Sequence, residues 1–222
     1  MSDQRAPLRP RAAAENFFDR ARARLQLEVP LALTDPLAEG ARGDLDLNPA
    51  LWERAGVSAT RPAAVLVPII DRREPTVLLT LRTKELASHA GQVAFPGGKI
   101  DPDDESPVTA ALREAKEEIG LAPSLVEPLG YLDLYLTFSG FRILPTVARV
   151  KPEFTLVVNP REVTETFEVP LAFLMNPANH QCGSRDWKGI MRDYYAIPFG
   201  DRYIWGITAG IVRNLYERVY GA

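Results

Sequence analysis

Alternating hydrophobic and polar positions predict strands and helices along most of the chain. Apolar runs with a period of two, bounded by polar turns, are typical of strands, and apolar residues spaced at three and four are typical of helices. Strands are predicted near residues 63–70, 77–82, 126–136, 142–150, 193–198 and 202–204. Helices are predicted near residues 12–26, 107–119 and 207–220, with a short strand and helix from 168 to 173. Strands in mixed order with helices on both faces favour an α/β/α sandwich, here with an N-terminal helical extension.

The helix at 107–119 is predicted with particular clarity from its two ends. Ser106 is a good N-cap, and Pro107 suits the first helical position, where a missing N–H costs nothing. Gly120 suits the position just past the last turn, where a left-handed backbone is common. One face of this helix is apolar and is expected to pack on the core: Val108, Ala111, Leu112, Ala115 and Ile119.

Three carboxylates, Glu114, Glu117 and Glu118, share another face of the same helix. A solvated acidic face would explain such a cluster, since like charges at this spacing cost only a few tenths of a kcal/mol. Two features favour a bound cation instead. The acids lie near the helix C-terminus, where the macrodipole disfavours negative charge. The loop 95–99 before the helix contains two glycines, which allow close approach of the backbone to a ligand.

The acidic run 101–105 raises the alternative of a calcium-binding EF-hand loop. Such a loop requires glycine at its sixth position and a bidentate glutamate at its twelfth. Counted from Asp101, those positions hold Ser106 and Leu112. An EF-hand is therefore excluded.

The segment from the glycines to the end of the helix resembles the signature of the Nudix hydrolases. The matching residues are Gly98, an acid at Asp104, and Arg113-Glu114-Ala115-x-Glu117-Glu118-x-Gly120. The usual pattern places seven residues between its first acid and the arginine, which would make that acid Glu105. Either the loop carries one extra residue or Asp104 takes the place of the acid, and the sequence leaves both open.

A narrower resemblance points to the coenzyme A pyrophosphatase branch of that family. It rests on the segments Leu78-Leu79-Thr80-Leu81-Arg82-Thr83 and His89-Ala90-Gly91-Gln92-Val93-Ala94-Phe95-Pro96-Gly97-Gly98. This resemblance implies a metal-dependent hydrolase that cleaves the pyrophosphate bond of coenzyme A or its derivatives, giving 3′,5′-ADP and 4′-phosphopantetheine or its acyl form. Two alternatives stay open: a Nudix pyrophosphohydrolase of other nucleotides, such as ADP-ribose or NADH, and a Nudix-like domain that binds a nucleotide without cleaving it.

The expected cofactor is Mg²⁺ or Mn²⁺, because magnesium binds carboxylates, waters and substrate phosphates through oxygen. The predicted metal ligands are Glu114 and Glu118, Glu117 as a shared or outer ligand, and the carbonyl of Gly98. Arg113 is expected to orient the glutamates through a bidentate pair. The general base is assigned to Glu162, with Glu165 as the alternative on the same turn. The residues expected to contact substrate are Arg82, Gly97, Gly98 and Lys99.

Composition narrows the class of protein further. A net charge of −3 gives no indication of nucleic-acid binding, and no apolar run is long enough for a membrane span. A single cysteine, Cys182, excludes an internal disulfide. We expect a cytoplasmic enzyme with a small-molecule nucleotide substrate, and the sequence leaves a homodimer open. Residues 1–62 are predicted to form a loose tail (1–11), the first helix and an extended arm that wraps a Nudix domain at 63–222.

Overall fold

A computed structural model gives the structure, and it describes residues 10–35, 41–43, 46–51, 61–85, 89–187 and 189–221. Residues 1–9 of the predicted tail and residues 36–40, 44–45 and 52–60 of the predicted arm lie outside this part. Helix α1 spans Pro10–Arg24, so it takes up the last two residues of the predicted tail and ends two residues earlier than expected. Proline at its first position has no N–H to leave unpaired, which suits the start of a helix.

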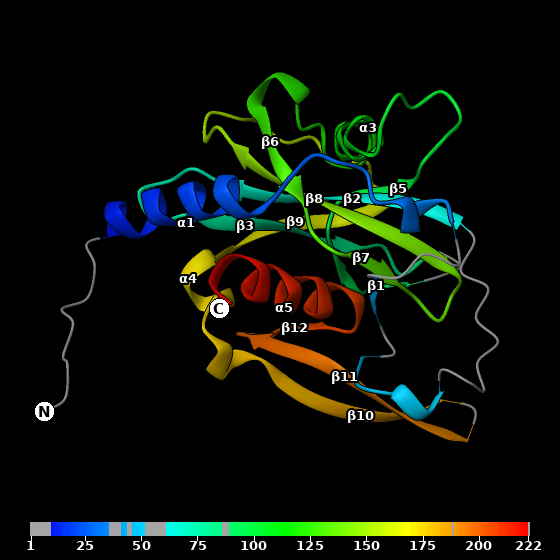
Figure 1. Cartoon of the computed structure of the whole chain (residues 1–222). Coiled ribbons are helices and arrows are strands. Elements are labelled where there is room, and N and C mark those ends of the chain that lie inside the picture. Colours follow the sequence, from blue (N-terminus) through cyan, green and yellow to red (C-terminus); the bar gives the residue numbers. More distant parts are fainter. Residues whose placement is uncertain are drawn as a thin grey trace, which may run out of the picture.

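Among the described residues, nine strands form one mixed sheet in the middle of the molecule (Figure 1). The strands are β1 (Ala41–Gly43), β2 (Arg61–Ile70), β3 (Thr76–Arg82), β4 (Val93–Ala94), β5 (Gly97–Lys99), β6 (Val126–Tyr131), β7 (Leu134–Leu136), β8 (Phe141–Val150) and β9 (Val163–Pro170). The central order is β1-β7-β8-β2-β3-β4, with β5 beside β2, β6 beside β8 and β9 beside β3. Strands β2 and β8 run parallel along their full length, whereas β2 pairs antiparallel with β3 and β5.

Helices cover both faces of this sheet, which confirms the predicted α/β/α sandwich. Figure 1 shows α3 (Pro107–Ile119) on one face and α5 (Ile207–Tyr220) on the other. Helix α1 packs with α5 in the same core cluster. Strand β2 is buried on both sides, because successive side chains of a strand point to opposite faces. Its residues Ala64, Leu66 and Ile70 pack with α3, and its residues Ala63, Val67 and Ile69 pack with α1 and α5.

A second, antiparallel sheet lies on the far side of α5 (Figure 1). In the described part of the chain it consists of β10 (Gln181–Trp187), β11 (Ile190–Phe199) and β12 (Arg202–Trp205). The β11–β12 hairpin confirms the prediction made for residues 193–204. Strand β10 was not predicted, because its sequence Gln-Cys-Gly-Ser-Arg-Asp-Trp has almost no apolar alternation.

Two other strand predictions were wrong in their limits. The strand expected at 126–136 is two strands, β6 and β7, and its register against β8 shifts between Pro128 and Gly130. Gly130 has a φ of 152°, where a Cβ would lie 2.5 Å from the Cβ of Leu25. Strand β9 begins at Val163, five residues before the strand predicted from 168, and it leads directly into the short helix α4 (Leu171–Leu174).

The described parts of the N-terminal arm contact the central sheet at two places. The 3₁₀ helix at Leu31–Leu33 is held by the Arg142 guanidinium, which donates hydrogen bonds to the carbonyls of Ala32 and Asp35. Strand β1 pairs in parallel with β7, and a further 3₁₀ turn spans Pro49–Leu51. Strand β2 begins at Arg61, so the arm ends two residues before its predicted limit. The division into an arm and a Nudix domain stays a prediction.

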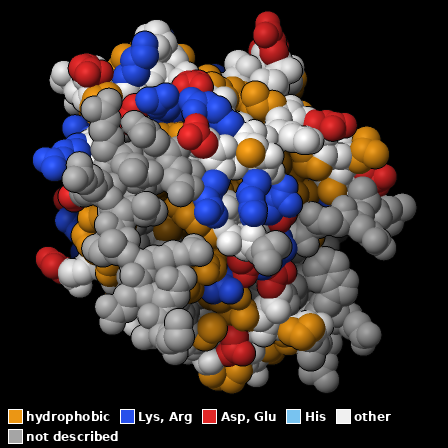
Figure 2. Space-filling model, turned by 60° about the vertical axis from the view of Figure 1, so that its left-hand side comes forward, with side chains coloured by type: hydrophobic (Ala, Val, Ile, Leu, Met, Phe, Trp, Pro, Cys, Tyr) orange, Lys and Arg blue, Asp and Glu red, His pale blue; other side chains and the backbone are white. Residues whose placement is uncertain are grey.

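Two surface properties bear on the expected partners. Within the described ranges, no helix is both long and apolar enough to cross a bilayer. The charge is unevenly distributed: Figure 2 shows Lys and Arg side chains gathered near the middle of one face, with hydrophobic side chains between them and acids nearby. The small net charge therefore results from local groups of both signs.

Candidate active site

The glycine-rich segment forms β5, which pairs with β2 and comes shortly before α3 in the chain. Gly97 has a φ of 154°, and a Cβ there would lie 2.4 Å from the carbonyl oxygen of Ala64. A Cβ on Gly98 would lie 2.5 Å from the carboxyl carbon of Glu114. Gly97 therefore requires glycine, whereas a side chain at position 98 would displace the Glu114 carboxylate. In the structure, the group closest to the open side of Gly98 is the carboxylate of Glu114, and the approach of a ligand to this loop stays a prediction.

Helix α3 begins and ends as predicted. The hydroxyl of Ser106 accepts a hydrogen bond from the backbone N–H of Thr109 at 3.1 Å, as an N-cap does. Gly120 has a φ of 71° and closes the helix by donating its N–H to the carbonyl of Lys116. These ends fix which residues of the helix face the sheet and which face the loop before it.

Arg113 is the centre of an ion-pair network that ties this helix to the loop. Its Nε and Nη2 donate to the two carboxylate oxygens of Asp104 at 3.1 and 2.9 Å. The same guanidinium donates to Glu114 Oε1 at 2.9 Å, to the carbonyl of Lys99 at 3.1 Å and to Glu117 Oε2 at 3.4 Å. Its bidentate partner is Asp104, whereas the sequence prediction assigned that pairing to the glutamates.

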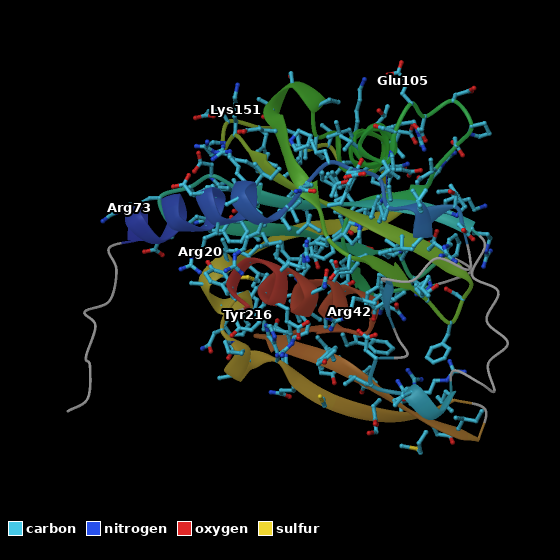
Figure 3. The ribbon with its side chains drawn as sticks, viewed as in Figure 1. Arg20, Arg42, Arg73, Glu105, Lys151 and Tyr216 are labelled. Atoms are coloured by element: carbon cyan, nitrogen blue, oxygen red, sulfur yellow. The ribbon has the colours of Figure 1, made fainter. Side chains whose placement is uncertain are left out.

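The spacing ambiguity between Asp104 and Glu105 is settled by this pairing. The Asp104 side chain is only 4% exposed, and the Arg113 guanidinium lowers its pKa. Glu105 is exposed, and its side chain points outward from the molecule (Figure 3). Asp104 therefore stands in the position of the first acid of the pattern.

Glu118 is a buried acid, only 2% exposed. Its carboxylate accepts a hydrogen bond from the Gly97 N–H at 3.2 Å and lies 3.3 Å from Arg82 Nη1. Burial, opposed by Arg82 and by the Gly97 N–H, raises the pKa of Glu118 to about 7. The sequence placed Glu118 on a face away from the core, and the structure corrects this: the last turn of α3 buries it against β3 and β5.

Glu114 and Glu117 differ in their surroundings although they are three residues apart. Burial raises the pKa of Glu114, and its pair with Arg113 opposes that shift. Glu117 is 55% exposed at the outer edge of the helix. Within the described residues, no group of three His, Cys, Asp or Glu side chains is assembled as a metal site. The site thus offers two partly or fully buried carboxylates, Glu114 and Glu118.

These carboxylates fit a divalent cation whose remaining coordination positions are filled by waters and substrate phosphates. Two acids whose charged forms are disfavoured by burial and by mutual repulsion are stabilised by a nearby positive charge. Magnesium is typically held by one or two carboxylates, with waters and substrate phosphates filling the other positions. All of the donors here are oxygens, which suits Mg²⁺ and Mn²⁺.

Glu162 reaches the same site from a distant segment of the chain. The backbone N–H of Asn159 donates to the carbonyl of Glu118 at 2.8 Å, which fixes the segment before β9 against the end of α3. The Asn159 side-chain amide then donates to Glu162 Oε1 at 3.1 Å. The charge of Glu162 contributes to the raised pKa values of Glu114 and Glu118. The alternative base, Glu165, instead pairs with Arg202 of β12.

A cleft of about 950 Å³ lies between the two sheets and reaches the glycine-rich loop. Its described lining includes Arg82, the ion-pair partner of Glu118, but not Glu114, Glu118 or Glu162 themselves. All four residues predicted to contact substrate line it: Arg82, Gly97, Gly98 and Lys99. Its other walls come from β7, the turn before β8, the start of α5 and the second sheet. These walls were not predicted from the sequence. They are aromatic and cationic residues spread over 135–205, whose proximity depends on the fold.

The arrangement described so far is that of a cation-assisted hydrolase with a nucleotide-sized cleft, and comparison with known proteins gives its family. Residues 60–181 match the NUDIX domain. A Yersinia pestis protein named "Uncharacterized Nudix hydrolase NudL" is 44% identical over 163 residues, which cover 73% of this chain and 82% of the relative. The chain therefore belongs to the Nudix family.

Solved structures give more distant matches. DR0079 from Deinococcus radiodurans is 16% identical with a TM-score of 0.47, covering 71% of this chain and 86% of that one. An Ap4A hydrolase from Caenorhabditis elegans is 19% identical with a TM-score of 0.43, covering 50% of this chain and 80% of that one. Membership of the Nudix family makes the protein a hydrolase that acts on pyrophosphate bonds of nucleoside diphosphate derivatives. Nudix hydrolases generally use divalent ions such as Mg²⁺ or Mn²⁺.

Proposed function

We propose that this hydrolase cleaves the pyrophosphate bond of coenzyme A or its derivatives, with Mg²⁺ or Mn²⁺ as cofactor. The products would be 3′,5′-ADP and 4′-phosphopantetheine, or the acylated form of the latter. The observation that carries the proposal is that the two segments 78–83 and 89–98 lie side by side. They resemble the coenzyme A pyrophosphatase branch, and both run to the edge of the cleft beside Glu118.

Backbone hydrogen bonds join these two segments. Strands β3 and β4 pair antiparallel, with Leu81 opposite Val93, and the N–H of Arg82 donates to the carbonyl of Gln92 at 3.0 Å. His89 lines the cleft and has a φ of 56°, which makes it the one non-glycine residue with positive φ in the described chain. Its ring nitrogen Nδ1 lies 3.0 Å from Gln92 Oε1. Residues held in such sparsely populated backbone conformations cluster at ligand-binding sites.

The residues around Glu118 then have distinct roles in the proposed reaction. Glu114 and Glu118 would hold the divalent ion, with Glu117 as an outer ligand and the Gly98 carbonyl beside them. The ion, when bound, neutralises phosphate oxygens and lowers the pKa of water. Arg113 keeps the Glu114 carboxylate in place through its pairs with Asp104 and the Lys99 carbonyl.

Proton transfer and charge stabilisation fall to other side chains. Glu162, oriented by the Asn159 amide, is proposed to accept the proton of the attacking water. Arg82 lines the cleft next to Glu118 and is proposed to contact the pyrophosphate, together with Lys99 and the N–H groups of Gly97 and Gly98. The non-catalytic alternative loses its support, because the family match and the relatives are hydrolases.

A substrate panel tests the proposal. Coenzyme A, NADH, ADP-ribose and dATP are incubated with enzyme and magnesium, and the products are separated by chromatography. We expect the highest kcat/KM for coenzyme A, with ¹⁸O from labelled water in one product phosphate. Glu118→Gln is the control for contaminating phosphatases, since it removes a proposed metal ligand. A tenfold or larger preference for ADP-ribose or NADH would overturn the coenzyme A assignment and leave the family activity intact.

A further inference from the structure

The cleft has a second cationic end, far along the chain from the glutamates. Arg185 of β10 and Arg192 of β11 stand directly opposite each other in an antiparallel pair, and both line the cleft. Like charges in directly opposed positions destabilise a sheet. The pair therefore places two guanidinium groups side by side at this end of the cleft, where a doubly charged anion could contact both.

Aromatic rings hold these two arginines. The Cζ of Arg192 lies 3.9 Å from the ring centroid of Phe138, and the Cζ of Arg185 lies 5.9 Å from that of Trp205. Trp205 packs edge-on against Tyr194, with 5.2 Å between ring centroids. Within the described part of the chain, Arg185 makes no ion pair with a carboxylate. A guanidinium stacked on a ring keeps its N–H donors in its own plane, where they suit a phosphate.

Asp193 also borders the cleft. It is engaged by the hydroxyl of Ser184, which stands opposite it on β10. The backbone of Asp193 is fixed by Asn48, which donates to its carbonyl and accepts from its N–H, both at 2.8 Å. Neighbouring residues of a strand alternate between its faces, so Asp193 and Ser184 point to the face opposite Arg192 and Arg185.

The cleft thus joins two cationic ends through an aromatic wall. One end, with Arg82 and Lys99, lies beside the glutamates. The other is formed by Arg185 and Arg192. We propose that these two arginines bind the 3′-phosphate of the substrate's adenosine, with the purine against the Trp205 and Tyr194 rings; this rests on the proposed function. The pair selects nucleotides phosphorylated on the ribose over those that carry only the pyrophosphate.

Paired substrates test the selection. Wild-type enzyme is assayed with coenzyme A and with 3′-dephospho-coenzyme A, which differ only in the phosphate in question. We expect a preference for coenzyme A in kcat/KM of at least about 10-fold, as charge-assisted hydrogen bonds to a phosphate provide. The double variant R185Q/R192Q lowers kcat/KM for coenzyme A by at least about 10-fold and changes the value for the dephospho substrate less than about threefold.

Two controls accompany these rates. Arg73→Gln removes one exposed arginine from the turn between β2 and β3, outside the cleft, and should change neither value. Lysine at both positions keeps the charge but loses the planar fork, so it should recover part of the preference. Equal wild-type rates for the two substrates, or an equal loss of both in the double variant, would overturn the proposal.

Binding separates this proposal from the proposed function. Calorimetry with adenosine 3′,5′-bisphosphate and with 5′-AMP needs no catalysis. We expect wild type to bind the bisphosphate at least about 10-fold tighter, and the double variant to bind both alike. If the protein fails to cleave coenzyme A but shows this difference, the arginine site stands and the substrate assignment falls. If coenzyme A is cleaved but the two nucleotides bind wild type alike, the arginine site falls alone.

Discussion

Replacing Glu118 with glutamine should make the metal-free protein more stable while it destroys activity. Glu118 is buried at the end of α3, and its pKa is raised from its usual value of 4.5 to about 7. An acid whose pKa is raised by folding costs stability when it is ionised. The cost is absent below the unfolded pKa and fully present above the folded pKa, so wild type loses stability between about pH 4.5 and 7. Glutamine carries no charge and has no such cost.

The magnitude follows from the size of the pKa change. A rise from 4.5 to about 7 is a difference of about 2.5, and each pKa unit corresponds to about 1.4 kcal/mol. The ionised carboxylate therefore costs about 3 kcal/mol above pH 7. At pH 8.5, E118Q should exceed wild type by up to about 3 kcal/mol in free energy of unfolding. At pH 5 the advantage should fall below about 1 kcal/mol, because most of the cost is then relieved.

Urea denaturation in the presence of a chelator measures this difference. Midpoints and slopes are compared for wild type, E118Q and E117Q at pH 5 and pH 8.5. Glu117→Gln is the matched control: it makes the same chemical change one residue away, at a side chain that is 55% exposed and solvated by water. E117Q should track wild type at both pH values. The kcat of E118Q should fall by at least ~10² in saturating magnesium, as expected when preorganised charge at the reacting group is lost.

Two outcomes would contradict this reasoning. If the stability difference between E118Q and wild type is the same at pH 5 and pH 8.5, then ionising the buried Glu118 carboxylate does not cost stability. If E118Q is less stable at pH 8.5, the pair with Arg82 and the Gly97 N–H outweighs that cost. Retention of more than about a third of the wild-type rate would remove Glu118 from the catalytic site.

Three further predictions follow from the same region. Millimolar Mg²⁺ or Mn²⁺ should raise the Tm of chelator-cleared wild type, because the ion binds the folded site and not the unfolded chain. The Tm of E118Q should rise much less, and equal shifts of the two proteins in scanning fluorimetry would count against the site. Ser106→Ala should cost about 1 kcal/mol of stability through the lost N-cap, with KM unchanged; coincident urea midpoints would show that the cap contributes nothing. Gly97→Ala should cost more than about 2 kcal/mol, because its φ is 154° and the Cβ overlaps Ala64; Gly200→Ala, at positive φ in open space, is the comparison in the same denaturation assay, and an equal loss would mean that the overlap adds nothing.

Much of the architecture around α3 was predictable from sequence alone, because it is local. A serine, a proline and a glycine at fixed spacing determine where this helix begins and ends, and the structure has it at Pro107–Ile119. The continuous apolar run of β2 is typical of a strand buried on both faces, which is what the sandwich requires. Strand β10 has no such pattern, so its place in the second sheet depends on pairing with β11.

The glutamates show where local information ends. Helical spacing puts Glu114, Glu117 and Glu118 on neighbouring positions, and that much follows from sequence. It does not distinguish the exposed Glu117 from the buried Glu118, because burial depends on β3 and β5 packing against the last turn of the helix. The raised pKa of Glu118 is a property of that packing, since removal from water disfavours its charge.

Contacts between distant segments decided the rest of the site. The choice of Asp104 over Glu105 as partner of Arg113 depends on how the loop 101–105 closes, which spacing left open. Glu162 joins the site only because Asn159 hydrogen-bonds the end of α3. The cleft walls come from strands more than a hundred residues apart. Sequence therefore determined the helix, its acids and the family resemblance. The tertiary structure alone decided which acid is buried, what pairs with it and what lines the cleft, because those depend on long-range packing.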